Sequence, residues 1–370
     1  MINKKRRPPL TVVFDLREVL FQQRGWERYG INLLRELIRS NKIKVSYIAE
    51  DRKRARKAYP FLFTAATRTF EMKINPLPRK GLPTKSFIEG HDIYHSLTDY
   101  PEFIPRRAKL ITSVHDLSFE LLAEYQQKGF TRLMRDNLLT VARHSSALIC
   151  FSRTTKKIFT DFAEKNNVEA SLPVAVIPHG IDHICRGTDK MPSKVSRPRL
   201  PYFLYTGALD KDKNINRMVL GFLKATQNRD LRLVLAGPEK RGSGIRKSLL
   251  NHKKIQYLGY VNDNELKELY TAAECFITAS LDEGFGLCPL EAMRCGTPVI
   301  CSDIGCFRET LKDRAIFFDP YDTDDIADKI RLFLKAPLKQ RNRIITDNPA
   351  EVFSWRDSAR QTLELYRSIL

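Results

Sequence analysis

Residues 280–298 read Ser280-Leu-Asp-Glu283-Gly-Phe-Gly286-Leu-Cys-Pro289-Leu-Glu291-Ala-Met-Arg-Cys-Gly296-Thr-Pro298. An apolar run ends at the start of this segment, and Pro289 falls in the first turn of a helix, where its missing amide costs no hydrogen bond. The glycines permit a tight turn and a close approach of the backbone to a ligand. The amides of residues 286–288 would then be unpaired donors at a helix N-terminus, which suits a phosphate. The segment therefore predicts a strand, a phosphate-binding loop and a helix.

Two carboxylates flank this helix start. Glu283 lies on the loop, and Glu291 lies eight positions later in the first helical turns. The two side chains can bracket a ligand whose phosphates occupy the helix end, because each can accept hydrogen bonds from hydroxyl groups. The alternative is an ordinary turn in which Glu283 caps the helix and Glu291 pairs with Arg294 at i,i+3. The spacing alone leaves both interpretations open.

Short apolar runs alternate with helix-period segments along the 370 residues, which predicts an α/β fold with stacked βαβ units and parallel sheets. The expected strands are residues 10–16, 43–49, 92–96, 109–114, 147–151, 202–206, 231–236, 275–279, 298–301 and 315–318. The expected helices are residues 29–38, 130–142, 216–225, 265–273, 289–294 and 324–334. Because the pattern restarts at residue 202, the sequence predicts two Rossmann-like halves.

The boundary between the halves is expected at residues 184–201, which contain three prolines and little apolar periodicity. Such a composition is typical of an interdomain linker. The linker separates an N-terminal domain, residues 1–183, from a C-terminal domain, residues 202–352. Residues 353–370 predict a final helix, and the pattern leaves open where it packs, with the N-terminal domain as one candidate surface.

The charge is strongly basic and uneven. The formal net charge is +20, and residues 1–180 hold 32 Lys and Arg against 18 Asp and Glu. Dense basic runs at residues 4–7 and 52–57 favour a phosphate-rich partner such as nucleic acid, an anionic membrane surface or small phosphorylated substrates, although a solvated surface explains each run equally well. No nucleic-acid module or interleaved exposed aromatic pattern accompanies them, so we expect no nucleic-acid partner.

The seven cysteines form an odd count without a Cys-x-x-Cys pair, which argues against a zinc ribbon and a disulfide framework. Cysteines scattered in apolar runs usually pack as small hydrophobic residues, so we expect a reducing cytoplasm. The first apolar run breaks at Asp15 and Arg17, and no run approaches ~20 apolar residues. We therefore expect no export signal and no spanning helix, and only peripheral contact with a membrane.

The segment from Glu283 to Glu291, with residues 292–300 after it, resembles the E-x7-E motif of the retaining, GT-B-fold, family-four nucleotide-sugar glycosyltransferases. Five further segments resemble the same family in the same order, at residues 114–119, 177–182, 235–238, 257–261 and 353–355. The resemblance covers most of the chain. It implies a GT-B architecture in which the two Rossmann-like domains face each other across a cleft, with the acceptor on the N-terminal side and the nucleotide sugar on the C-terminal side.

The resemblance also implies roles for particular residues. Glu283 would hold hydroxyls of the transferred sugar, and Glu291 would hold the ribose hydroxyls. The donor-binding loop would comprise Gly284, Phe285, Gly286, Leu287 and Cys288. His115 would reach the donor sugar, and Lys213 would contact the diphosphate, because the family binds no metal to balance the charge of the leaving group. Without the family, His115 would be interpreted as structural and Lys213 as a surface lysine.

The N-terminal loop and one C-terminal loop depart from the family pattern. Gly25 and Arg28 lie in an acceptor or phosphate loop where relatives often have Gly-Ile-Gly-Arg-Tyr, and Glu27 replaces the second glycine. Ala208 and Asp212 stand where relatives usually have an arginine. These departures put the acceptor side and the stabilisation of the leaving group in question, and they motivate the alternative of a non-catalytic, nucleotide-sugar-binding scaffold.

The function implied by the resemblance is a retaining, metal-independent hexosyltransferase without a cofactor. Its substrates would be a nucleotide-diphosphate sugar and a glycan or lipid-linked acceptor in polysaccharide or lipopolysaccharide synthesis. GDP-mannose is the first expectation for the donor, because residues 114–119 are similar to bacterial mannosyltransferases, and a UDP-hexose is the alternative. The expected location is the cytoplasm, peripheral at the inner face of the membrane.

Overall fold

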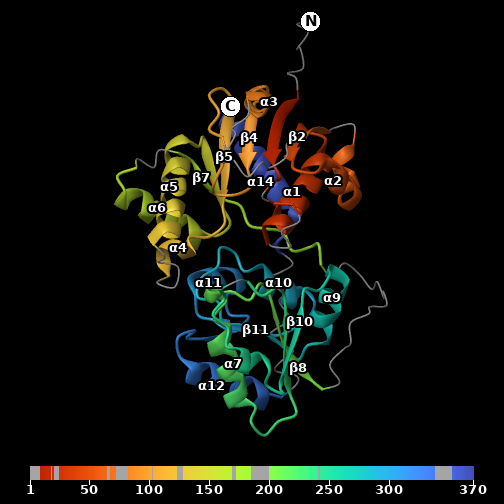
Figure 1. The fold of residues 1–370 in the computed structure, drawn as a ribbon, viewed down its shortest axis with the longest axis vertical. Coiled ribbons are helices and arrows are strands. Elements are labelled where there is room, and N and C mark those ends of the chain that lie inside the picture. Colours follow the sequence, from red (N-terminus) through yellow and green to blue (C-terminus); the bar gives the residue numbers. More distant parts are fainter. Residues whose placement is uncertain are drawn as a thin grey trace, which may run out of the picture.

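The computed structural model describes residues 9–17, 19–20, 25–64, 67–71, 82–101, 103–122, 128–168, 172–184, 200–240, 242–337 and 352–370. In Figure 1 the chain forms two α/β halves, one above the other, each built on its own sheet. Every strand pair in both sheets is parallel. The expectation of two Rossmann-like halves is confirmed.

The N-terminal sheet has seven strands in the order β3-β2-β1-β4-β5-β6-β7. They are β1 (Leu10–Asp15), β2 (Ile43–Ala49), β3 (Thr67–Glu71), β4 (Ile93–Ser96), β5 (Lys109–Val114), β6 (Ala147–Cys150) and β7 (Val174–Val176). Its helices are α1 (Gly25–Ser40), α2 (Arg52–Ala58), α3 (Leu82–Glu89), α4 (Ser118–Leu121), α5 (Lys128–His144) and α6 (Arg153–Lys165), with a 3-10 turn η1 (Pro60–Phe63). The strand order reverses between β1 and β4, and ligands of such sheets bind beyond the carboxyl ends of the strands at this switch point.

The C-terminal sheet has six strands in the order β10-β9-β8-β11-β12-β13, with its switch point between β8 and β11. They are β8 (Tyr202–Thr206), β9 (Arg232–Ala236), β10 (Ile255–Gly259), β11 (Cys275–Thr278), β12 (Val299–Ser302) and β13 (Ile316–Phe318). Its helices are α7 (Ile215–Ala225), α8 (Lys247–Leu250), α9 (Asp263–Ala272), α10 (Leu287–Arg294), α11 (Gly305–Leu311) and α12 (Thr323–Lys335), with a 3-10 turn η3 (Lys211–Lys213).

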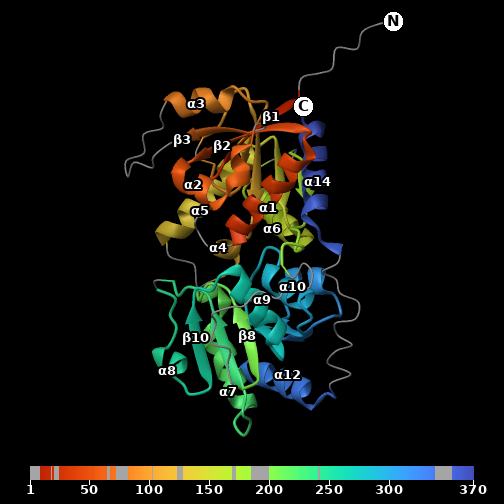
Figure 2. The same cartoon turned by 90° about the vertical axis from the view of Figure 1, so that its right-hand side faces the viewer.

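The last helix, α14 (Trp355–Ser368), belongs in space to the N-terminal half. It packs along α1, and Figure 2 shows the two helices side by side. The hydroxyl of Tyr366 lies 2.6 Å from Nδ1 of His95, a buried residue of β4 in the N-terminal sheet. Of the expected linker, residues 185–199 lie outside the described residues, as do residues 338–351 before α14 and the basic run at residues 4–7.

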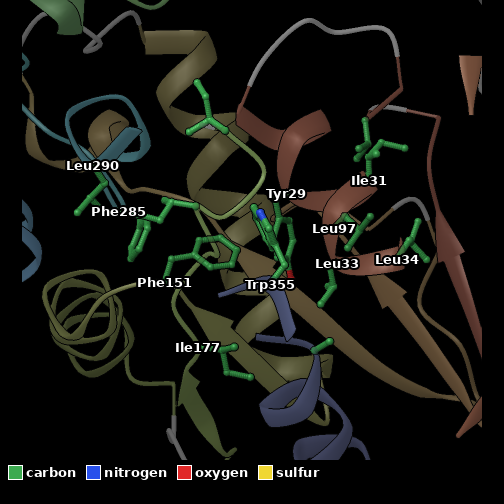
Figure 3. Close-up of a cluster of buried hydrophobic side chains, with 14 of the residues drawn as sticks. Tyr29, Ile31, Leu33, Leu34, Leu97, Phe151, Ile177, Phe285, Leu290 and Trp355 are labelled. Atoms are coloured by element: carbon green, nitrogen blue, oxygen red, sulfur yellow. The ribbon is translucent and has the colours of Figure 1, made fainter. Parts of the chain in front are cut away.

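One buried apolar cluster runs through both halves. Figure 3 shows Phe285 and Leu290 of the C-terminal half beside Phe151, Tyr29 and Trp355. The ring centroids of His179 in the N-terminal half and Phe285 in the C-terminal half are 5.1 Å apart, and edge-to-face pairs at such distances are favourable. The two halves are therefore packed against each other through their interiors.

The cysteines differ from the expectation at one position. Cys150, Cys275, Cys301 and Cys306 are free and buried, and Cys288 is free and half-buried. Cys295, however, is disulfide-bonded, although it also packs against the apolar cluster, and the odd count and scattered spacing of the cysteines did not indicate this bond. The pairing of cysteines in disulfides cannot be deduced from their spacing in the sequence alone. Within the described ranges, no helix is both long enough and apolar enough to cross a membrane.

Candidate functional site

The expected site residues follow strands that end at the facing edges of the two sheets. His115 comes directly after β5, and α1 follows β1 at the N-terminal switch point. Lys213 follows β8 and Glu283 follows β11, the two strands at the C-terminal switch point. Because parallel strands end at one edge of their sheet, the topology brings these distant segments together.

The start of α10 lies beyond the carboxyl end of β11, at the C-terminal switch point. The helix begins at Leu287, two residues before the expected Pro289, and its N-cap is Gly286 with a φ of 86°. A Cβ at this glycine would lie 2.8 Å from the ring of Phe307. Because glycine carries no capping side chain, the first amides of α10 are donors that a phosphate can satisfy.

Lys213 forms an ion pair with Glu283, which lies in the loop before α10. Nζ of Lys213 donates to Oε1 of Glu283 at 2.7 Å and lies 2.8 Å from Oδ2 of Asp212. Burial alone would lower the pKa of Lys213, but Asp212 and Glu283 outweigh it and hold the pKa well above its usual value. Lys213 is therefore a permanent cation. Asp212, which departs from the family pattern, is buried and its charge is offset by Lys213.

Glu291 is buried, and groups from both halves donate to it. Oε1 accepts from Nη1 of Arg28 at 2.5 Å and from Nε2 of His183 at 2.9 Å, and Oε2 accepts from the hydroxyl of Tyr270 at 3.1 Å. Burial would raise the pKa of Glu291, but Arg28 and His183 outweigh it and lower the pKa to about 2. The pairing with Arg294 that an ordinary turn would give is not observed, because Arg294 donates to the carbonyl of Ile184.

The start of α1 meets the start of α10. A Cβ built on Gly25 would lie 3.7 Å from Cδ1 of Leu287, and Nη2 of Arg28 donates to Oδ1 of Asp263 at 2.6 Å. The expected acceptor or phosphate loop thus reaches the other half of the molecule, where Arg28 binds two carboxylates. Glu27 points to a different neighbour and accepts a hydrogen bond from the hydroxyl of Tyr59 at 2.5 Å.

His115 is buried against aromatic side chains. Its Nε2 must carry the proton, because it donates to the carbonyl of Leu97 at 2.7 Å. The ring centroids of Trp26 and Phe151 lie 5.3 and 4.8 Å away. Burial lowers the pKa of His115 to about 4, so the ring is neutral at physiological pH. The donor loop touches this residue, since a Cβ on Gly284 would lie 1.6 Å from the carbonyl oxygen of His115.

Several contacts between the halves have no signal in the sequence. Ser118 donates to Oδ2 of Asp282 at 2.8 Å, and Oγ1 of Thr155 donates to the carbonyl of Gly284 at 3.2 Å. Burial and the charge of Asp116 raise the pKa of Asp282 to about 6. These partners are more than 120 residues apart in the sequence, so no local pattern could pair them. The one available signal for Asp282 was its position beside Glu283.

Across the parts of the chain with assigned positions, no cluster of three His, Cys, Asp or Glu side chains has the placement that a metal ion needs.

Comparisons with known proteins add independent information. Residues 188–350 match the family described as glycosyl transferases group 1. The chain is 30% identical over 310 residues to the O-antigen chain mannosyltransferase B of Escherichia coli, an alignment that covers 76% of this chain and 80% of that protein. It is 26% identical over 300 residues to the serotype-specific mannosyltransferase WbdA of Escherichia coli, which covers 77% of this chain and 36% of that protein. The crystal structure of Anabaena HepE in complex with UDP-glucose has the same fold, with a TM-score of 0.74 and 16% identity over 97% of this chain and 100% of that one.

Proposed function

The chain belongs to the group 1 glycosyl transferases and has the GT-B fold, and from this premise we propose that it transfers a hexose from a nucleotide-diphosphate sugar. The observation that supports this proposal best is the start of α10, a helix N-terminus with Gly286 as its N-cap. Glu283 lies before it and Glu291 within it, and Lys213 binds Glu283. A helix N-terminus and a half-buried cation together suit a diphosphate.

In the proposed reaction the bond between the anomeric carbon and the diphosphate breaks, so negative charge accumulates on the departing oxygen. Lys213 and the amides of residues 287 and 288 would stabilise this charge, and interactions that strengthen in the transition state lower the barrier. We propose retention of configuration, in which the acceptor oxygen bonds to the anomeric carbon on the face that the diphosphate leaves, while the departing phosphate oxygen accepts the proton of the acceptor hydroxyl. No carboxylate of the enzyme then attacks, and Glu283 only holds the hydroxyls of the sugar.

Binding of the ribose would involve an exchange at Glu291. A carboxylate accepts roughly four hydrogen bonds, and Arg28, His183 and Tyr270 already supply three. Two ribose hydroxyls would therefore displace one donor. Arg28 is the donor that can leave, because its side chain is 22% exposed and Asp263 holds it as well. His115, whose neutral ring has Nδ1 as its acceptor, would bind a hydroxyl of the donor sugar.

For the donor we propose GDP-mannose, because the two relatives described above are named as mannosyltransferases. For the acceptor we propose a glycan or lipid-linked saccharide of polysaccharide or lipopolysaccharide synthesis, because one of these relatives is named as an O-antigen chain mannosyltransferase. A UDP-hexose is the alternative donor, and UDP-glucose is bound in the structure of HepE. No cofactor and no metal ion take part in the proposed reaction.

Thermal unfolding with a panel of nucleotides tests the donor proposal. A ligand present at 100 times its Kd stabilises the folded protein by about 2.7 kcal/mol, so GDP is expected to raise the Tm and UDP to leave it nearly unchanged. A rise in Tm with UDP alone would favour a UDP-hexose as the donor and would still support the proposed transferase activity. No rise with any nucleoside diphosphate would contradict the proposed function, and binding without turnover of GDP-mannose or UDP-glucose would favour the scaffold.

The proposed location is the inner face of an anionic membrane. Helix α2 exposes Lys53, Arg54, Arg56 and Lys57, while Ala55 is buried against the N-terminal sheet. Basic residues near a membrane contribute about 1 kcal/mol each to binding of anionic lipid, and salt screens this attraction. We expect the protein to float with vesicles that contain phosphatidylserine in low salt. It should dissociate from them in about 0.5 M salt, because the shorter Debye length screens the attraction. Binding that is insensitive to lipid charge and to salt would contradict the proposal.

A further inference from the structure

A chain of hydrogen bonds connects Trp355, at the start of α14, to Glu291 in α10. The indole Nε1 of Trp355 donates to Nδ1 of His183 at 3.0 Å, and Nε2 of His183 contacts Oε1 of Glu291 at 2.9 Å. All three side chains are buried or nearly so. The indole nitrogen is only a donor, so Nδ1 of His183 must be the acceptor. The ring proton of His183 is therefore on Nε2, where it is donated to Glu291.

The members of this chain come from both halves of the molecule. His183 lies just after the last strand of the N-terminal half, and Trp355 lies where the chain returns to that half. The two segments are joined to each other, because the amide of Trp355 donates to Oδ1 of Asp182 at 2.8 Å and that of Ile181 donates to the carbonyl of Phe353. Glu291 is on the C-terminal half. The orientation of Glu291 therefore depends on a group that the N-terminal half holds in place.

We propose that His183 is a positioning residue for Glu291 and that Trp355 fixes the ring proton of His183 on Nε2. The inference rests on the proposed function, because it assigns Glu291 to the ribose of the donor. Of the donors to Oε1, Arg28 is the one that the ribose would displace, whereas His183 has a second partner that fixes its ring. With His183 in place, the Glu291 carboxylate keeps one orientation while its other hydrogen bonds are exchanged.

Two substitutions separate the two hydrogen bonds of His183. In His183→Gln, the side-chain amide nitrogen reaches the position of Nε2 and can donate to Glu291. In His183→Asn, the shorter side chain places its oxygen near the position of Nδ1, where it accepts from Trp355 and does not reach Glu291. A purely structural role in joining the crossing segments would favour Asn over Gln, and a positioning role favours Gln.

The measurement is calorimetric titration with GDP and with UDP, followed by donor kinetics with the nucleotide sugar of whichever binds. His183→Asn removes a hydrogen bond to a charged carboxylate, which should weaken nucleotide binding. We expect Kd and the donor KM to rise about tenfold, with kcat nearly unchanged. His183→Gln is expected to remain close to wild type. Equal affinities of the two variants, or tighter binding by His183→Asn, would overturn the proposal.

Trp355→Phe provides a second test that does not depend on how His183→Asn folds. It keeps a buried ring and removes the indole N–H, so it should raise Kd in the wild-type background. In the His183→Gln background, Trp355→Phe should not raise Kd further, because the amide of Gln donates to Glu291 without a hydrogen bond from Trp355. An equal loss in both backgrounds would show a packing effect and contradict the role of Trp355.

Glu291→Gln distinguishes failure of this inference from failure of the proposed function. If Glu291→Gln weakens nucleotide binding and His183→Asn does not, only the positioning role is wrong. If Glu291→Gln instead binds GDP and UDP with the same affinity as wild type, the assignment of Glu291 to the donor is wrong. The inference about His183 then fails with it.

Discussion

Replacing Lys213 by alanine is expected to lower kcat by roughly 10²–10³-fold, because loss of one preorganised donor to a developing anion costs this much in enzymes. Lys213 binds Glu283 in the loop before α10, and its charge is permanent because Asp212 and Glu283 hold its pKa well above the usual value. The departing diphosphate carries more charge in the transition state than in the bound donor. The loss should therefore be larger in kcat than in the affinity for the nucleotide sugar, and release of nucleoside diphosphate measures it.

A second lysine of the same domain provides the control. Lys247 pairs with Glu239 at 2.9 Å on the surface, and Lys247→Ala removes an ion pair of the same kind away from the site. Surface ion pairs contribute about 0–1 kcal/mol, so Lys247→Ala should keep the kcat of the wild type. Lys213→Arg keeps the positive charge and should recover part of the turnover. Equal kcat for Lys213→Ala and wild type would remove Lys213 from the mechanism.

Gly284→Ala is expected to lower turnover by about 10²-fold or more, because a displacement of ~1 Å in a catalytic arrangement costs this much. A Cβ at Gly284 would lie 1.6 Å from the carbonyl oxygen and 2.7 Å from the carbonyl carbon of His115. Both are backbone atoms and cannot rotate away, so the two halves must separate. The hydrogen bonds from Ser118 to Asp282 and from Thr155 to Gly284 would be lost with this movement.

Kinetics and small-angle scattering together test this steric argument. The variant should keep the secondary structure of the wild type and show a larger radius of gyration. Gly129→Ala is the matched control, because Gly129 lies in α5 with no heavy atom within 4 Å of the added Cβ. A Gly284→Ala protein with the turnover and scattering profile of the wild type would show that the contact of Gly284 with His115 is not needed.

The sequence predicts every central strand and misses three of the four strands that lie at the edges of the sheets, the exception being β13. Each expected strand is present within about two residues, because strands buried on both faces are continuous apolar runs. The strands that escaped prediction are β3, β7 and β10, and all three lie at the end of a sheet. β3 reads Thr-Arg-Thr-Phe-Glu and β7 has only three residues. An edge strand has one neighbour and needs fewer apolar side chains, so it gives a weak signal.

The site shows a similar division between local and distant information. The loop and helix at residues 280–298 were predictable, because glycines, Pro289 and the strand end are all local signals. The partners of Glu291 were not, since Arg28 and His183 are 263 and 108 residues away in the sequence. The alternative pairing with Arg294 follows a local i,i+3 rule, and the donors that Glu291 binds instead are brought near only by the tertiary fold.

The central claim is that a nucleoside diphosphate binds at the start of α10 between Glu283 and Glu291. The most direct measurement is a crystal structure of the protein with the nucleoside diphosphate that raises its Tm. We expect diphosphate oxygens within hydrogen-bond distance of the amides of Leu287 and Cys288, Nζ of Lys213 beside them, and ribose hydroxyls on Glu291. A nucleotide bound elsewhere, with Arg28 still on Glu291 and the start of α10 without a phosphate, would contradict the account.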